Sequence, residues 1–235
     1  MFDVYDLPCS LVFDDATISV EGNPGLFKYR REIKGTVVEK ILAMDNIRIA
    51  IHPVEPLMTP KNITHYLMLS FQTPILLHPN TSKRIFGTFP VDIGIFVIGK
   101  GHSDLIDVFS FNAGKFTLYG DPSKGVLCKY WSTPIFPEDP KTASKHQGVL
   151  QLTIANHNSR IVQVTKCILN AYGMKLFYGT DGISMSATMK ITGKQIAETD
   201  ILDKPREKGL HKSIELYSLK LLSVASKKFV MEGEF

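Results

Sequence analysis

Apolar residues recur at every second position through much of this chain, and that period restricts most of it to extended strands. In segment 46–51, Ile47, Ile49 and Ile51 share one parity, and segment 67–71 repeats the pattern. The 17 Gly and 13 Pro residues fall mostly between such runs. Short alternating segments separated by turn residues are typical of β-sandwiches and barrels. We therefore predict an all-β protein made of two sandwich-like antiparallel β domains.

A break in this pattern suggests where the two domains meet. Segment 132–148 holds Pro134, Pro137 and Pro140 followed by a polar stretch, and proline clusters of this kind mark loops and linkers. We expect an N-terminal β-sandwich-like domain at 1–135, a Pro-rich linker or long loop at 136–147, and a C-terminal Ig-like β-sandwich domain at 148–235. The length of 235 residues is sufficient for two cores of about 100 residues each.

Turn residues also predict some local connections. Segment 105–131 reads as a three-stranded meander with turns at 112–115 and 120–125, and segment 149–164 reads as a hairpin. β-Branched residues favour a strand over a helix within 32–44. Segment 216–228 is compatible with an amphipathic helix or with two strands, and the scarcity of other helices favours strands.

The composition excludes several classes of protein. A hydrophobic content of 44% and a net charge of +4 are incompatible with an extensively disordered chain. This charge gives a weak field, so a nucleic-acid partner is not expected. No run of about 18 apolar residues predicts a transmembrane helix, and the N-terminal segment lacks the basic and apolar regions of a signal peptide. The three cysteines form no C-x-x-C pair, which favours small buried hydrophobes in a reducing, cytoplasmic environment.

Several short motifs occur in a fixed order along the chain. They are Pro74-Ile75, Pro79, the block 87–97 (Gly-Thr-Phe-Pro-Val-Asp-Ile-Gly-Ile-Phe-Val), Tyr119-Gly120-Asp121-Pro122, Cys128-Lys129-Tyr130-Trp131 and Ala171-Tyr172-Gly173-Met174. Together they resemble an uncharacterised family of archaeal proteins described as a domain of unknown function, and the resemblance spans nearly the whole chain. It implies no activity, cofactor or catalytic residue.

Two pairs of residues have spacings compatible with a metal site. His52 and Glu55 are three residues apart, and His102 and Asp104 are two apart, which places the latter pair on one face of a strand. Imidazole and carboxylate groups could bind a borderline or hard cation. The alternative is that these residues occupy ordinary solvated loop positions, because no H-E-x-x-H motif supports a metal centre.

Basic residues suggest a possible anion-binding surface. Lys28, Arg30 and Lys34 share strand parity and could face phosphate or an anionic lipid surface. Lys100 lies between two glycines whose amides could help to bind an anion. The alternatives are cross-strand ion pairs for the first group and a simple hairpin turn around Lys100.

The motifs required for catalysis are missing, which favours a non-catalytic binding or assembly protein with no cofactor. A metal-dependent hydrolase on a β-scaffold, and a weak anionic-surface or nucleic-acid binder, are the alternatives. Exposed strand edges could pair with another chain. We therefore expect a protein partner or self-association by β-edge pairing.

Overall fold

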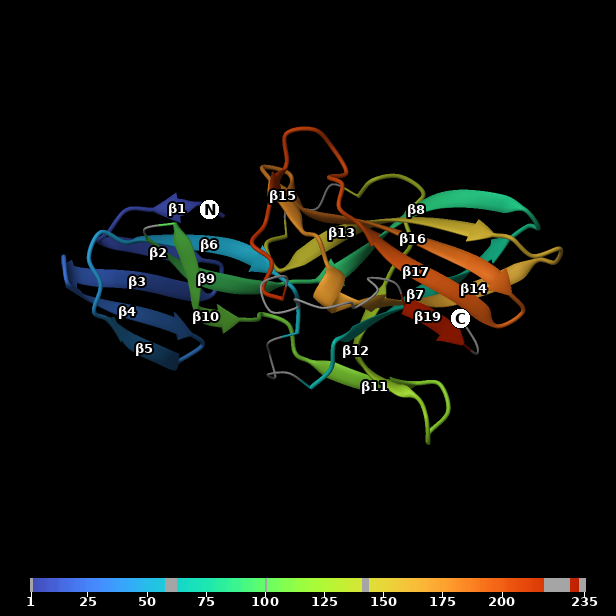
Figure 1. Cartoon of the computed structure of the whole chain (residues 1–235), viewed down its shortest axis with the longest axis horizontal. Coiled ribbons are helices and arrows are strands. Elements are labelled where there is room, and N and C mark those ends of the chain that lie inside the picture. The colour runs from blue at the N-terminus through green and yellow to red at the C-terminus, as the bar shows by residue number, and fades with distance from the viewer. Residues whose placement is uncertain (1, 58–62, 100, 141–143, 218–228, 233–235) are drawn as a thin grey trace. The chain divides into compact units, whose positions relative to one another are not determined.

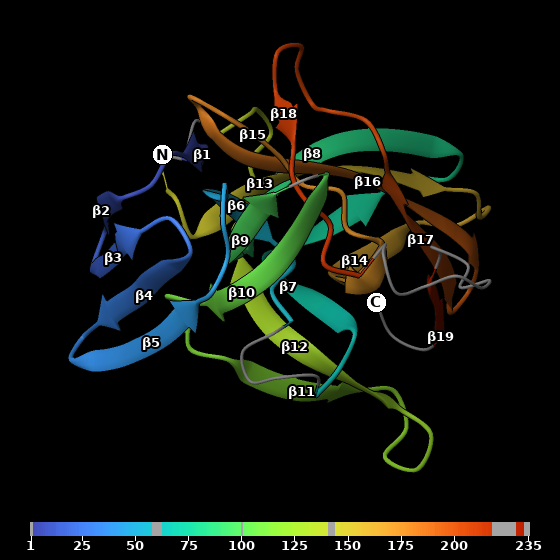
Figure 2. The same cartoon turned by 60° about the vertical axis from the view of Figure 1, so that its left-hand side comes forward.

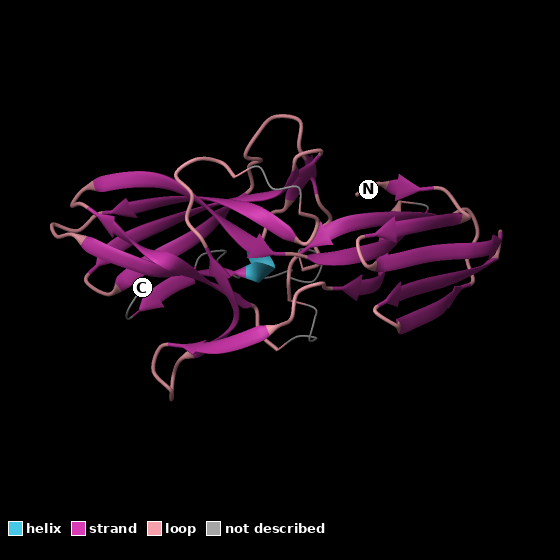
Figure 3. Ribbon diagram, turned by 180° about the vertical axis from the view of Figure 1, so that it is seen from behind, coloured by secondary structure: helices cyan, strands magenta, loops and turns pink. Residues whose placement is uncertain are grey.

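Strands dominate the structure, which confirms the predicted all-β class. The structure is a computed structural model that describes residues 2–57, 63–99, 101–140, 144–217 and 229–232. Among these residues the helical content is one 3-10 turn, Ala171–Gly173 (Figures 1 and 3). No helix in the described part of the chain has the length and apolar character needed to cross a membrane.

The chain divides into two compact units that each combine separate stretches of sequence. Unit 1 contains residues 1–52 and 94–108, and unit 2 contains residues 53–93 and 109–235. Three strands lie mainly in unit 1: β6 (Arg48–Val54), β9 (Asp92–Gly99) and β10 (His102–Phe109). The last residues of β6 and β10 and the first residues of β9 belong to unit 2.

Unit 1 contains two four-stranded sheets. The first is an antiparallel meander of neighbouring strands, β2 (Cys9–Phe13), β3 (Ala16–Asn23), β4 (Leu26–Ile33) and β5 (Thr36–Leu42). The second has the order β1-β6-β9-β10, where β1 is Val4–Tyr5. Alternate side chains are buried from Ala16 to Val20 on β3 and from Phe27 to Arg31 on β4. This alternation places the apolar face of the meander in the core.

A polar contact in unit 1 links the meander to the second sheet. The Tyr29 hydroxyl and the Arg31 Nε both donate hydrogen bonds to Asp107 Oδ2, at 2.7 Å and 2.6 Å. The side chains of Arg31 and Asp107 are only 10% and 9% exposed. Burial, followed by the negative charge of Asp107, raises the pKa of the Tyr29 hydroxyl far above its ordinary value. This hydroxyl is therefore a permanent donor to the buried carboxylate.

Unit 2 also contains two sheets. The first has the order β11-β12-β7-β14, and its strands are Lys115–Tyr119, Val126–Thr133, Tyr66–Leu77 and Val162–Asn170. The second has the order β18-β15-β16-β13-β8, and its strands are His211–Lys212, Phe177–Gly179, Gly182–Gly193, Gln147–Asn156 and Thr81–Pro90. β17 (Ile196–Leu202) pairs with β16, and β19 (Phe229–Glu232) pairs with β17 (Figure 2).

Side-chain hydrogen bonds connect the two sheets of unit 2. The Thr88 amide of β8 donates to Thr133 Oγ1 of β12 at 2.7 Å. The Thr199 hydroxyl of β17 donates to the Ile168 carbonyl of β14 at 2.5 Å. Two neighbouring pairs in this unit, β12–β7 and β13–β16, run parallel, whereas the other pairs in these two sheets are antiparallel. Parallel neighbours require long connections, so the chain crosses repeatedly between sheets.

The two units do not coincide with the predicted domains. The described residues 136–140 and 144–147 lie within unit 2, and strands before and after them share sheets. β8 pairs with β13 in the register Pro90↔Gln147 to Thr81↔Asn156, and β7 pairs with β14. The physical reason is that long-range strand pairing, rather than the proline content of a loop, determines which segments form one core.

Two predicted local connections were wrong. The strand expected at the start of the 105–131 meander, β10, pairs with β9 instead of β11. The two strands of the expected hairpin at 149–164, β13 and β14, lie in different sheets. The strand expected within 32–44 is confirmed as β5. Most of 216–228, where helix and strands were both considered, lies outside the described residues.

Candidate functional site

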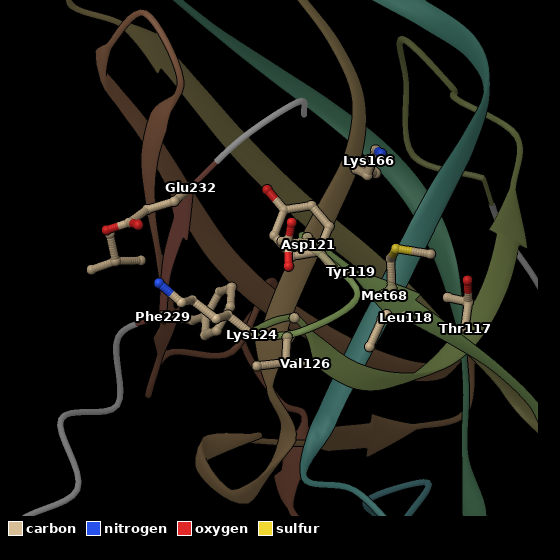
Figure 4. Close-up of a pocket in the computed structure, with 13 residues that line it drawn as sticks. Met68, Thr117, Leu118, Tyr119, Asp121, Lys124, Val126, Lys166, Phe229 and Glu232 are labelled. Atoms are coloured by element: carbon tan, nitrogen blue, oxygen red, sulfur yellow. The ribbon is translucent and has the colours of Figure 1, made fainter.

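A hollow of about 800 Å³ lies over one face of the sheet β11-β12-β7-β14 in unit 2. Its lining combines side chains from five strands with the turn at 120–125. Those that matter for its chemistry are Met68, Tyr119, Lys124, Lys166, Phe229 and Glu232 (Figure 4). The hollow therefore brings together residues that are up to 164 positions apart in the sequence.

Strand register explains how several of these side chains reach the same face. Tyr119 of β11 is opposite Val126 of β12, and both line the hollow. Lys166 of β14 is opposite Ser70 of β7, two positions from Met68 on the same face of that strand. The pairing of β14 with β7 shifts register between Val164 and Lys166. Such β-bulges redirect a side chain, and this one lies directly beside the lysine that faces the hollow.

The hydroxyl of Tyr119 is the most informative group in the hollow. Tyr119 is 7% exposed, and its hydroxyl has no hydrogen-bond partner among the described residues. Burial raises the pKa of Tyr119 to about 12, and the neighbouring Cys128, Cys167 and Glu232 side chains add to the shift in that order. The phenol is therefore protonated at neutral pH and retains a donor without a partner among the described residues. A buried polar group without a partner costs about 1–3 kcal/mol, which an acceptor bound in the hollow would recover.

Charged side chains surround this phenol. The Lys166 Nζ lies 5.6 Å from the centroid of the Tyr119 ring, in a cation–π arrangement. Lys124 and Glu232 are exposed on the side of the hollow formed by the turn and β19, as Figure 4 shows. Asp121 Oδ1 accepts hydrogen bonds from Ser123, and these hold the pKa of Asp121 below its usual value. The hollow thus offers two ammonium groups, a phenol donor and two carboxylates.

Apolar side chains complete the lining of the hollow. Met68 and Phe229 contribute a thioether and an aromatic ring, and Val126 and Leu118 add aliphatic surface. A concave site with an apolar lining and a few convergent polar groups is the usual form of a small-molecule site. This arrangement can hold a ligand and orient it, because its polar groups converge from β11, β14, β19 and the turn at 120–125.

Comparison with known proteins places the chain in a family. The family described as "Protein of unknown function (DUF432)" matches residues 1–232. The chain belongs to the DUF432 family. No curated protein and no solved structure matches it. The resemblance expected from the motifs around 87–97 and 119–122 is thereby confirmed for this DUF432 protein, while archaeal origin and cytoplasmic location stay predictions.

The residues predicted to bind metal occupy very different environments in the DUF432 protein. His52 is 8% exposed and packs edge-to-face against the Phe96 ring, with a centroid distance of 5.9 Å. Burial lowers the pKa of His52 and raises that of the 1%-exposed Glu55. His102 and Asp104 are exposed on β10. Among the described residues, no group of three or more His, Cys, Asp or Glu side chains is placed to hold a metal ion.

The residues predicted to bind anions are already paired with carboxylates. Lys28 Nζ lies 2.8 Å from Glu39 Oε1, and Arg30 lies 2.6 Å from Glu32 Oε2 and 3.5 Å from Glu39 Oε1. Lys34 Nζ lies 3.8 Å from an oxygen of Asp15 in the neighbouring turn. These contacts favour the ion-pair alternative for the three side chains.

The remaining basic candidate, Lys100, lies outside the described residues. Anion binding by Lys28, Arg30, Lys34 and Lys100 therefore stays a prediction. The turn at 120–125 is predictable from the sequence, whereas the hollow above it is not. No local sequence motif marks Lys166 or Phe229 as part of a site, because each lies in a segment with the alternation of an ordinary β-strand.

Proposed function

We propose that this DUF432 protein is a non-catalytic binding protein and that its ligand occupies the hollow in unit 2. The buried Tyr119 hydroxyl, which has no partner among the described residues, carries the proposal. Buried polar groups in native proteins normally have a partner. An unsatisfied donor on a residue that lines the hollow supports a ligand that accepts its hydrogen bond.

The lining indicates the chemistry of this ligand. It carries a hydrogen-bond acceptor, preferably an anionic oxygen, which would approach the Tyr119 phenol and the Lys166 ammonium. It also has an apolar or aromatic body that contacts Met68 and Phe229. The carboxylates of Asp121 and Glu232 balance the charges of the two lysines, so we do not expect the hollow to bind polyanions without selectivity.

Titration with 8-anilinonaphthalene-1-sulfonate tests the proposal, because this dye combines an aromatic body with a sulfonate and fluoresces when it enters an apolar site. We expect saturable binding at one site. Tyr119→Phe removes one hydrogen bond worth about 1 kcal/mol, so the dissociation constant should rise about fivefold. Lys166→Met should weaken binding to a similar extent, whereas Lys83→Met, at an exposed lysine on β8, should leave it unchanged.

Native mass spectrometry of the gently purified full chain provides a second measurement. A small molecule that remains bound to the wild-type protein and is lost from the Tyr119→Phe variant would support the proposal. Unsaturable dye binding, or equal affinity in all the variants, would contradict it.

A further inference from the structure

The outer edge of β5 in unit 1 has the features of a pairing surface. Among the described residues β5 pairs only with β4, and it is the last strand of the meander. The two strands are joined by Lys34 and Gly35, whose φ angles of 47° and 79° are typical of a tight two-residue hairpin turn. In such a hairpin Ile33 and Thr36, which flank the turn, form a hydrogen-bonded pair.

Alternation along β5 then determines which backbone groups are free to pair. Residues at even positions from Thr36 to Leu42 bond to β4, so the N–H and C=O groups of Val37, Glu39 and Ile41 point away from the sheet. The side chains of these same three residues share the outer face of the meander. Val37 is 43% exposed and Ile41 is 62% exposed.

Charge on this edge is locally compensated. Glu39 stands between the two apolar side chains, and its carboxylate lies 2.8 Å from Lys28 Nζ and 3.5 Å from Arg30 Nε on β4. Charged residues on an edge strand often prevent pairing with another chain. Here the carboxylate is held by two cations of its own sheet, so its capacity to repel a second strand is reduced.

We propose that β5 pairs antiparallel with β5 of a second copy of this chain, with Glu39 on the two-fold axis. This register places Val37 opposite Ile41 of the partner subunit, and Ile41 opposite Val37 of the partner subunit. The three outward-facing positions of each strand then form about six backbone hydrogen bonds. Around the axis, each of the two facing Glu39 carboxylates is compensated by Lys28 of its own subunit and by Arg30, which it shares with Glu32.

Other pairings fit less well. Moving the axis from Glu39 to either neighbouring residue places an apolar side chain, Val37 or Ile41, opposite a glutamate. On the other edge of the meander, the outward-facing positions of β2 are Ser10 and Val12, so an equivalent pair would match a hydroxyl with a valine. Of the two edges of the meander, β5 is therefore the one with a self-complementary apolar match. A contact of this small size implies a weak dimer with a dissociation constant in the micromolar range.

Sedimentation velocity of the full chain from about 1 μM to about 500 μM tests this dimer. We expect a monomer–dimer equilibrium in the wild-type protein. Val37→Pro removes an outward-facing N–H and leaves the bonds to β4 intact, so it should weaken the dimer at least tenfold. Val12→Pro is the matched control, because it removes an outward-facing N–H from the opposite edge of the same sheet.

A second variant tests the dimer without proline, in case Val37→Pro does not fold. Ile41→Lys changes an exposed side chain, keeps every backbone group, and should also weaken the dimer at least tenfold. Circular dichroism establishes that each variant is folded. A wild-type protein that stays monomeric throughout the range would overturn the proposal. So would a dimer that survives both β5 changes, or one that Val12→Pro weakens as much as Val37→Pro does.

Discussion

Replacing Glu55 by glutamine tests how burial controls the pH dependence of stability in unit 2. The Glu55 side chain is 1% exposed; its Oε2 accepts a hydrogen bond from the Leu216 amide at 3.2 Å, and its Oε1 has no hydrogen-bond partner among the described residues. Burial raises the pKa of this carboxyl from 4.5 to about 7. The bond from Leu216 and the charge of Lys175 oppose the shift, and Glu215 adds to it.

The magnitude and sign follow from proton linkage. A pKa difference of about 2.5 units between the folded and unfolded states corresponds to about 3 kcal/mol. Because the folded state has the higher pKa, it holds its proton longer. The contribution of the protonated Glu55 carboxyl to the free energy of unfolding is fully present below the unfolded pKa of 4.5. It decreases as the pH rises and is lost above the folded pKa of about 7.

The assay is urea-induced unfolding of wild-type and Glu55→Gln proteins from about pH 4 to about pH 8. The protein has one tryptophan, Trp131, on β12 of unit 2, so its fluorescence reports on the unit that contains Glu55. Glutamine keeps an acceptor for Leu216 but does not ionise. The wild-type protein should therefore lose about 3 kcal/mol relative to the variant across this range.

Glu138→Gln, at an exposed carboxylate of the same unit, is the control and should show no comparable trend. A stability difference between wild type and Glu55→Gln that is independent of pH would contradict a raised Glu55 pKa in the folded state. A gain in stability of the wild-type protein relative to Glu55→Gln as the pH rises would contradict it equally.

Three further predictions concern packing, buried charge and thiol chemistry. Asp107→Ala leaves the buried guanidinium of Arg31 without its carboxylate, and we expect a loss of about 3–5 kcal/mol in urea unfolding followed by circular dichroism; a loss below about 1 kcal/mol would contradict this. Gly148→Ala would place a Cβ 2.3 Å from the Phe89 ring, so the melting temperature should fall, consistent with overpacking of about 1–3 kcal/mol. In a thiol titration of the native protein only Cys9 should react, since the other two cysteines are buried and burial raises their pKa values to about 12.

Local sequence patterns predicted the strands well but not their neighbours. Alternation in 46–51 and 67–71 corresponds to β6 and β7, and the turn at 120–125 lies between β11 and β12. Every strand shares the same period of two, however, so the pattern cannot say which strand lies beside which. This is why β10 was expected beside β11, and β13 beside β14.

The hollow could not be predicted from the sequence for the same reason. Tyr119 lies in a motif that supported the family resemblance, but its missing hydrogen-bond partner is a property of the packed sheet. Lys166 reaches the hollow beside a β-bulge, which appears only when β14 is paired with β7. Phe229 arrives through the pairing of β19 with β17.

The sequence by itself determined that the chain forms strands, where most of them turn, and which family it belongs to. These properties depend on side-chain periodicity, on backbone conformations of glycine and proline, and on short motifs, all of which are local. Tertiary structure decided the composition of the two units, the burial of Glu55 and the residues around the hollow. Those depend on contacts between segments far apart in the chain, where many pairings satisfy the same local pattern and only packing selects one.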